Sequence, residues 1–320
     1  MSATGTVPAP AGPGLPRPRV GVAGLGIMGG AIARNLAAAG FAVAGFDPDG
    51  ARGAALADVG VVACGSTAEL AARTDVLLSS LPSDAALAAT TAALVDACER
   101  RAATGSPATG SARLDWVELS TLSIPAKLQA RDRVALIGIA MLDAPISGTG
   151  AQAERRDLAV YGSGDVAAWQ RCVPVIDGFA RARHHVGAFG HGMRLKLVAN
   201  LLVAVHNVAT AEALGLAARA GLDPAQALDL LGGGAGASRI LALRGPLMVR
   251  GEYLPATMKL DVWQKDLALI EAFARAHDAA TPLFDATLPL YDAAIRAGLG
   301  AQDTAAVFRI LKEMSPDAAT

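Results

Sequence analysis

A glycine-rich turn near the start of the chain has the residue types and spacing of a phosphate-binding turn. It lies in the segment VGVAGLGIMGGAIARNLAAAGFAVAGFD, residues 20–47, and comprises Gly24, Gly26, Ile27, Met28 and Gly29. Gly24 permits a tight turn, Gly26 lets the backbone approach a pyrophosphate, and Gly29 lets a helix pack on a strand. The helix that follows would direct free N–H groups and its positive dipole end at the phosphates. Because strand, turn, helix, second strand and acid follow in this order, the segment predicts a nicotinamide or flavin dinucleotide site.

The acid that ends the second apolar run indicates which dinucleotide is bound. A carboxylate at Asp47 would accept hydrogen bonds from the adenosine ribose hydroxyls and would repel a 2′-phosphate. An arginine directly after the strand would favour NADP, but the chain continues with Pro48 and Asp49, and Arg52 follows only later. We therefore predict NAD as the cofactor, with NADP possible. The alternative, a solvated carboxylate in a turn, does not explain the register of Asp47 with the glycines.

A lysine and an asparagine stand four residues apart at the start of a long apolar helical pattern. Lys196 and Asn200 therefore share one face of the expected helix, just after Gly190 and Gly192 at an expected domain boundary. A lysine on an apolar face is costly to bury without a partner, and its amine usually reaches solvent. In a cleft, desolvation and a positive nicotinamide would lower its pKa and make it a usable general acid or base. Spacing alone leaves both interpretations open.

Three expected strands run into short segments that could face a substrate, because ligands of such sheets bind beyond the carboxyl ends of the strands. The segments are 82–83, 120–121 and 143–150, the last reading DAPISGTG. The N–H groups and hydroxyls of this small-residue loop could hold a carboxylate, although an ordinary turn has the same composition. Lys265 and Asp266 could reach the same cleft from a later helix, or form a surface ion pair. The five histidines have no metal-binding spacing.

The elements that must position these residues change in kind along the chain. Strand-like runs alternate with helical patterns in the first half, at residues 19–23, 42–46, 61–63, 76–81, 116–119 and 139–142. This alternation predicts a parallel sheet with helices on both faces. Residues 158–161 and 183–186 could add strands at the sheet edge. Residues 102–113 resemble a flexible surface insertion without chemistry.

Strand signals stop after Gly192, and helical patterns follow. Helices are expected over about 195–219, from Pro224 to the glycines at 232–234, and over 238–249, 257–276, 282–297 and 303–313. The predicted fold class is therefore α/β, a Rossmann doubly wound parallel sheet followed by an all-α C-terminal domain. The predicted division is a disordered tail at 1–18, an NAD-binding Rossmann domain at 19–188 and a helical domain at 189–320.

The overall composition excludes several classes of protein. The 320 residues fit two domains, and 52% hydrophobic with 18% charged residues allows a large core. A net charge of −1 gives no electrostatic reason to expect nucleic acid or an anionic membrane as a partner. Three cysteines without a CxxC pair favour a reducing cytoplasm, and the first residues lack the pattern of a signal peptide. The long helix carries too many polar residues for a membrane span.

Five blocks of sequence together resemble the β-hydroxyacid dehydrogenase family, over about residues 19–313. The blocks are GLGIMGGAIARNLAAAGF (24–41), ELSTLSIP (118–125), LDAPISGTGAQAE (142–154), GHGMRLKLVANLL (190–202) and QKDLAL (264–269). The family includes 3-hydroxyisobutyrate dehydrogenase and tartronate semialdehyde reductase. The resemblance implies dimers or tetramers built through the helical domain.

The resemblance also implies roles for individual residues. Lys196 matches the catalytic lysine, which gives a proton to the carbonyl oxygen in reduction and takes it back in oxidation, and Asn200 matches an asparagine that positions the substrate. The loop that binds the substrate carboxylate matches Ser147, Gly148 and Thr149. The contacts to the cofactor match Leu81, Pro82, Thr121 and Lys265.

Departures from the family pattern argue against transferring a named substrate. Thr149 replaces a second glycine of the substrate loop, residues 155–158 replace a more usual Gly-x-Leu pattern, and His191 stands where small residues are common. We expect an NAD(P)-dependent dehydrogenase of a small β-hydroxy acid, with Lys196 as general acid and base. The alternatives are an imine or aldehyde reductase on the same scaffold, or a non-catalytic dinucleotide sensor. Related imine reductases lack this lysine, so Lys196 favours alcohol and carbonyl chemistry.

Overall fold

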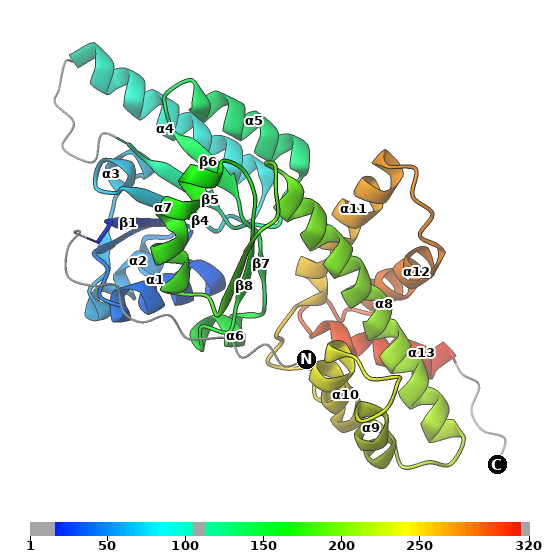
Figure 1. Cartoon of the computed structure of the whole chain (residues 1–320). Coiled ribbons are helices and arrows are strands. Elements are labelled where there is room, and N and C mark those ends of the chain that lie inside the picture. Colours follow the sequence, from blue (N-terminus) through cyan, green and yellow to red (C-terminus); the bar gives the residue numbers. More distant parts are fainter. Residues whose placement is uncertain (1–16, 105–112, 315–320) are drawn as a thin grey trace, which may run out of the picture.

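The computed structural model describes residues 17–104 and 113–314. The first half of the chain forms a six-stranded, all-parallel sheet in the order β3-β2-β1-β4-β5-β6 (Figure 1). The strands are β1 (Val20–Ala23), β2 (Val43–Phe46), β3 (Val62–Ala63), β4 (Val76–Ser79), β5 (Asp115–Glu118) and β6 (Ala140–Asp143). Each strand lies within two residues of its predicted bounds. The strand order reverses between β1 and β4, which is where doubly wound sheets bind dinucleotides.

Helices cover both faces of this sheet, because successive residues of each strand point to opposite sides. Leu77 and Leu78, both fully buried, belong to two separate apolar clusters. One cluster includes residues of α1 (Ile27–Ala38) and α7 (Val166–Asp177), and the other packs against α3 (Thr67–Ala72), α4 (Asp84–Thr104) and α5 (Ile124–Ala135). Shorter elements complete this half: α2 (Gly50–Ala54), η1 (Ala57–Val59) and α6 (Gly150–Glu154). The predicted doubly wound fold is confirmed.

The placement of the late strands was wrong. Residues 158–161 and 183–186 were expected at the edge of the main sheet, but they form β8 (Ala159–Gly162) and β9 (Ala182–His185) of a second sheet. A strand that was not predicted, β7 (Ile146–Ser147), pairs antiparallel with β8, while β8 and β9 are parallel. One isolated bridge, between Asp143 and Ser163, joins this sheet to β6. Pro145 has no N–H to extend that pairing, and the chain turns away into β7.

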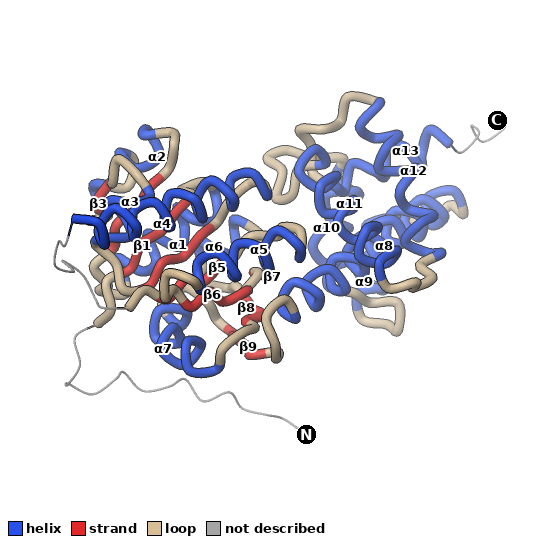
Figure 2. Tube along the Cα trace, turned by 90° about the horizontal axis from the view of Figure 1, so that it is seen from above, coloured by secondary structure: helices blue, strands red, loops and turns tan. Residues whose placement is uncertain are grey.

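The second half of the described chain is helical (Figure 2). Its elements are α8 (His191–Arg219), α9 (Pro224–Gly232), α10 (Arg239–Arg250), α11 (Leu260–Ala276), α12 (Pro282–Arg296), η2 (Thr304–Ala306) and α13 (Val307–Met314). The long helix α8 packs against α10, α11, α12 and α13 and against β8, so it links the two halves. It begins four residues earlier than predicted, and Gly192 lies in its first turn rather than in a preceding turn.

Two further expectations meet the structure only in part. Helix α4 continues to Thr104, so residues 102–104 are helical and not part of a loop. Residues 105–112 of the expected insertion lie outside the described residues, as do residues 1–16 of the expected tail.

By length and hydropathy alone, α8 could cross a membrane, although the polar residues in its sequence argued against this. Its packing among helices α9 to α13 is that of a core helix, which passes the same test. The boundary between residues 188 and 189 stays a prediction.

Candidate active site

The glycine-rich turn joins β1 to α1 with a geometry that only glycine permits at two positions. Gly24 has φ +86°, and a Cβ there would lie 2.2 Å from the carbonyl oxygen of Ser80. A Cβ on Gly29 would lie 1.8 Å from the carbonyl oxygen of Gly24, so α1 can pack this closely only without a side chain. Gly26 is the N-cap of α1 and makes no side-chain cap hydrogen bond, so the N–H groups of the first turn, which includes Ile27 and Met28, have no side-chain cap. The turn therefore fits a pyrophosphate.

Asp47 follows β2 directly and is held beside this turn. Its Oδ2 accepts a hydrogen bond from the Leu25 N–H (2.8 Å) and its Oδ1 accepts one from the Asp49 N–H (2.9 Å). The Arg52 guanidinium lies 3.4 Å from Asp47 and 3.3 Å from Asp49, and its side chain is half exposed. A carboxylate and an arginine thus stand together where an adenosine ribose would lie, which suits a ribose hydroxyl and also brings a positive charge within reach of a 2′-phosphate.

The other predicted cofactor residues lie on adjacent loops at the carboxyl ends of β4 and β5. The Leu81 N–H donates to Oγ of Ser120 (2.7 Å), which ties the loop that contains Pro82 to the loop that contains Thr121. The Lys265 amine, on α11, donates to the carbonyl oxygen of Thr121 (2.6 Å). These contacts bring α11 against the sheet edge where the glycine-rich turn also lies.

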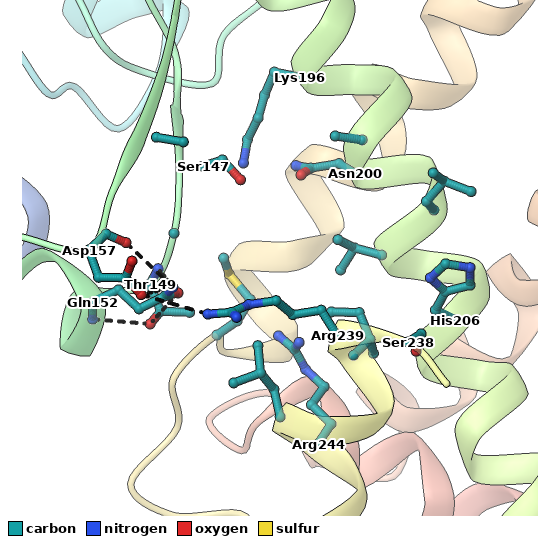
Figure 3. Close-up of a pocket in the computed structure, with 18 of the residues that line it drawn as sticks. Ser147, Thr149, Gln152, Asp157, Lys196, Asn200, His206, Ser238, Arg239 and Arg244 are labelled. Carbon is teal, nitrogen blue, oxygen red and sulfur yellow. Dashed lines mark hydrogen bonds and ion pairs between the residues drawn. The ribbon is translucent and has the colours of Figure 1, made fainter. Parts of the chain in front are cut away.

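The loop predicted to bind a carboxylate forms β7 and the start of α6. Gly148 has φ +145° and separates Ser147 from Thr149, the N-cap of α6. Thr149 and Gln152 form a reciprocal capping box: the Gln152 N–H donates to Oγ1 of Thr149 (3.4 Å), and the Thr149 N–H donates to Oε1 of Gln152 (3.0 Å). Because Thr149 is occupied in this way, the hydroxyl of Ser147 is the polar group of the loop that faces the lysine of α8 (Figure 3).

Lys196 and Asn200 lie on the face of α8 that looks toward this loop. Both are buried, with 9% and 4% of their surface exposed. The Lys196 amine points toward the Ser147 hydroxyl (Figure 3), and within residues 17–104 and 113–314 it has no ion-pair or hydrogen-bond partner. Burial lowers the pKa of Lys196; the negative charge of Asp266 opposes this shift, and the positive charge of Lys265 adds to it. The amine can therefore lose its proton more readily than a solvated lysine.

Asp266, which the sequence left undecided between cleft and surface, lies beside Asn200. It is buried, and its Oδ2 accepts a hydrogen bond from Nδ2 of Asn200 (3.0 Å), while its Oδ1 lies 3.7 Å from the Lys265 amine. Burial raises the pKa of Asp266, against the pull of Lys265 and Lys196. The sequence contained a signal for the burial of Asp266, because its spacing places it on the same helical face as Trp263 and Ile270, which are buried.

A second buried lysine, which sequence reasoning missed, fastens the start of α8 to the sheet. The Lys127 amine lies 2.6 Å from Oε2 of Glu118 and 2.7 Å from Oδ1 of Asp143, and all three side chains are fully buried. Oδ2 of Asp143 accepts hydrogen bonds from the Met193 N–H (2.8 Å) and from Oγ of Ser163 (3.1 Å). We call Glu118, Lys127, Asp143 and Ser163 the anchor cluster. No local pattern marks it, since its members come from separate segments.

One pocket of about 570 Å³ brings together the predicted catalytic and substrate-binding residues. These are Lys196, Asn200, Ser147, Gly148 and Thr149. Figure 3 shows Lys196 and Asn200 on the wall formed by α8, and Ser147 and Thr149 on the facing wall. The predicted cofactor residues do not line this pocket; they lie around the glycine-rich turn and its neighbouring loops. His191 does not line it either, because its ring is exposed and its Nδ1 lies 3.3 Å from the carbonyl oxygen of Val186. The far end of the pocket contains residues that the sequence did not single out.

Comparisons with known proteins agree with this architecture. Residues 19–195 match the family model described as the NAD binding domain of 6-phosphogluconate dehydrogenase. Residues 190–311 match a second family model, described as NAD-binding of NADP-dependent 3-hydroxyisobutyrate dehydrogenase. L-threonate dehydrogenase of Cupriavidus necator is 33% identical over 91% of this chain and 95% of its own length. 2-(Hydroxymethyl)glutarate dehydrogenase of Eubacterium barkeri is 27% identical over 93% and 96%.

Solved structures give the same result. The 3-hydroxyisobutyrate dehydrogenase of Mycobacterium tuberculosis superposes with a TM-score of 0.81 at 28% identity, over 92% of this chain and 99% of that one. These relatives favour hydroxy-acid chemistry over an imine or aldehyde reductase and over a sensor without activity. The chain is an NAD(P)-dependent oxidoreductase and belongs to the β-hydroxyacid dehydrogenase family.

Proposed function

We propose that the enzyme transfers a hydride between NAD and a small β-hydroxy acid, with Lys196 as the general acid and base. The observation that carries this proposal is a buried lysine amine without a partner among the described residues, which points at the Ser147 hydroxyl in a pocket between the two halves of the chain. A buried, unpaired amine with a lowered pKa gives up its proton more readily than a solvated lysine, as a general acid and base must.

Each side chain has a defined task in this proposal. The glycine-rich turn from Gly24 to Gly29 holds the pyrophosphate of the cofactor, which supplies hydride chemistry when bound. Asp47 accepts hydrogen bonds from the ribose hydroxyls. Ser147 and the N–H of Gly148 hold the substrate carboxylate, and Asn200, oriented by Asp266, positions the reacting hydroxyl. Aligning the two reactants in this way lowers the entropic part of the barrier.

Lys196 then moves the proton. In oxidation the neutral amine accepts the hydroxyl proton as the hydride leaves the same carbon, and in reduction the ammonium returns a proton to the carbonyl oxygen. The amine must therefore be neutral for oxidation and charged for reduction. The lowered pKa makes the neutral form easier to reach than in a solvated lysine, which favours this exchange.

We further propose the setting in which the enzyme works. Helices 189–320 would form the substrate and dimerisation domain of a homodimer or homotetramer, and the exposed apolar residues Val198, Leu202 and Leu216 on α8 support a partner surface there. The three cysteines are free, which suits the reducing cytoplasm. Asp47 makes NAD the preferred cofactor. NADP remains the alternative cofactor, because the nearby Arg52 could contact its 2′-phosphate.

A steady-state panel tests the proposal. NAD⁺ and NADP⁺ reduction would be followed with 3-hydroxyisobutyrate, glycerate, 3-hydroxypropionate and threonate as the hydroxy acids. We expect turnover of at least one of them, with NAD⁺ preferred. Cofactor binding without turnover of any hydroxy acid would contradict the proposal. A preference for NADP⁺ would contradict the role given to Asp47.

A further inference from the structure

The end of the pocket opposite Lys196 carries an excess of positive charge. Away from Lys196, the charged side chains that line the pocket are three arginines and one acid: Arg181, Arg239, Arg244 and Asp157. Figure 3 shows Lys196 at one end and the two arginines of α10 at the other. The tasks proposed above use the Lys196 end alone, so the arginine end has no assigned ligand.

Arg244 is the strongest feature of this end. Only 6% of its side chain is exposed, and its Nε donates to Oγ1 of Thr304 (2.6 Å) and lies 3.3 Å from Oδ1 of Asp303. Its two Nη groups have no partner within residues 17–104 and 113–314, and the guanidinium points into the pocket toward Arg239 (Figure 3). The Nη groups therefore face the pocket and not a protein acceptor, and a ligand with anionic oxygens could accept their hydrogen bonds.

Arg239 adds a second, movable guanidinium. It is the first residue of α10, its side chain is 70% exposed, and its contact with Asp157 is long at 3.6 Å. Asp157 already accepts shorter hydrogen bonds from Arg181 (2.6 Å) and from Gln152 (3.0 Å), and these lower the pKa of Asp157. Because one carboxylate serves two arginines, the region keeps a net positive charge, and Arg239 can turn to a ligand at small cost.

We propose that Arg244 and Arg239 bind a second anionic group of the substrate, so that the enzyme prefers a hydroxy acid with an acidic tail to one with a neutral tail. The inference rests on the proposed function, because it places the first carboxylate at Ser147 and the reacting hydroxyl at Lys196. Guanidinium forks bind carboxylates and phosphates bidentately, so the tail could end in either group. A pocket of about 570 Å³ also leaves room beyond a short monocarboxylate.

The test uses substrates that share one reacting end. 2-(Hydroxymethyl)pentanoate has a neutral tail, 2-(hydroxymethyl)glutarate replaces the end of that tail with a carboxylate, and the corresponding phosphonate tests the phosphate class. We expect kcat/KM to be higher for at least one acidic tail by about tenfold or more, as one charge-assisted contact would give. Equal values for all three tails would overturn the proposal.

Variants then assign the effect to these residues. In Arg239→Gln, and in Arg244→Lys, which keeps the charge beside Asp303 but loses the fork, the ratio of kcat/KM for acidic over neutral tail should fall several-fold. Arg250→Gln is the matched control, because Arg250 lies on the same helix, pairs with Glu252 and is not in the pocket lining. An unchanged ratio in both pocket variants would overturn the assignment.

A binding measurement separates this inference from the proposed function. With NAD⁺ bound, the acidic-tailed compound should raise Tm more than the neutral-tailed one, and Arg239→Gln should remove the difference. If no compound is turned over, the proposed function fails, and this Tm difference still decides whether the arginine end binds anions. Equal Tm shifts for all tails would overturn the inference even for an active enzyme.

Discussion

Two lysines are buried among the residues that the structure describes, and their surroundings are opposite. Lys127 lies in the anchor cluster, with two carboxylate oxygens within 2.7 Å of its amine. Lys196 lies 69 positions later on α8, buried to a similar degree but with no such partner among the described residues. Burial lowers the pKa of both amines, but at Lys127 the charges and hydrogen bonds of Asp143 and Glu118 outweigh it and raise the pKa.

The difference separates a structural charge from a reactive one. A lysine whose pKa is raised stays protonated and can only hold the fold together, here by tying α5, β5 and β6 to the start of α8. A lysine whose pKa is lowered is costly to keep charged, but it can exchange a proton with a substrate. The anchor cluster fixes the first turn of the helix that carries Lys196, so a structural site positions the lysine that we propose to be reactive.

Replacing the reactive lysine should have the largest effect. Lys196→Met keeps much of the side-chain volume and removes the proton carrier, so kcat for hydroxy-acid oxidation should fall by about a hundredfold to ten-thousandfold, the usual contribution of a general base. Steady-state kinetics measure this. Lys312→Met is the matched control, because Lys312 is exposed and lies over the Phe308 ring, far along the chain. A Lys196→Met enzyme with normal kcat would end the catalytic assignment.

The same substitution at the anchor cluster should act on stability instead. Lys127→Met leaves Glu118 and Asp143 buried without their cation, which should lower the free energy of unfolding by about 3–5 kcal/mol. Denaturant titration measures this, with Lys196→Met alongside. We expect Lys196→Met to be no less stable than the wild type. If both variants lost the same free energy of unfolding, the different surroundings of the two lysines would have no effect on stability, and the comparison would fail.

The sequence singled out Lys196, the lysine that we propose to be catalytic, but not Lys127, and the reason is how far apart the interacting residues lie. Lys196 and Asn200 share a helical face by spacing alone, and the glycine-rich turn is a local pattern. The partners of Lys127 lie 9 residues before it and 16 residues after it, at the ends of β5 and β6. Only the pairing of these two strands brings the partners together, and local sequence does not specify that pairing. The residues of β8 and β9 were assigned to the wrong sheet for the same reason. A strand-like run is visible in the sequence, whereas the strand that it pairs with is not. The six strands of the main sheet were predictable because alternating helices dictate a parallel order.

Asp266 extends the comparison, because it acts on the pKa of Lys196 as Glu118 and Asp143 act on the pKa of Lys127. Its charge raises the pKa of Lys196 against the effect of burial. Asp266→Asn removes that charge and keeps an acceptor for Asn200, so the pKa of Lys196 should fall further. Since oxidation needs the neutral amine, the acidic limb of the kcat profile should move to lower pH.

The same variant should also lower the plateau of that profile by about tenfold to a hundredfold, because Asn200 loses a charged hydrogen-bond partner. Rates measured from acidic to alkaline pH separate the two effects. Glu271→Gln on the exposed side of α11 is the control. A limb that stays in place, or moves to higher pH, would show that Lys196 does not set the profile.

The smallest predicted effect is the pH dependence of stability, where the two lysines should act in different ranges. An unfolded lysine has a pKa near about 10.4. Because the pKa of Lys196 is lowered by folding, the energetic cost of its charge is complete at low pH and disappears as pH rises toward about 10.4. Any stability advantage of Lys196→Met should therefore shrink over that range. The pKa of Lys127 is raised, so its stabilisation persists through this range and is lost only above it. Unfolding titrations of the wild type and both Lys→Met variants at a series of pH values measure this. A Lys196→Met difference that stays constant to pH 10 would mean that the amine is not desolvated in the folded enzyme, and the argument for its reactivity would fail.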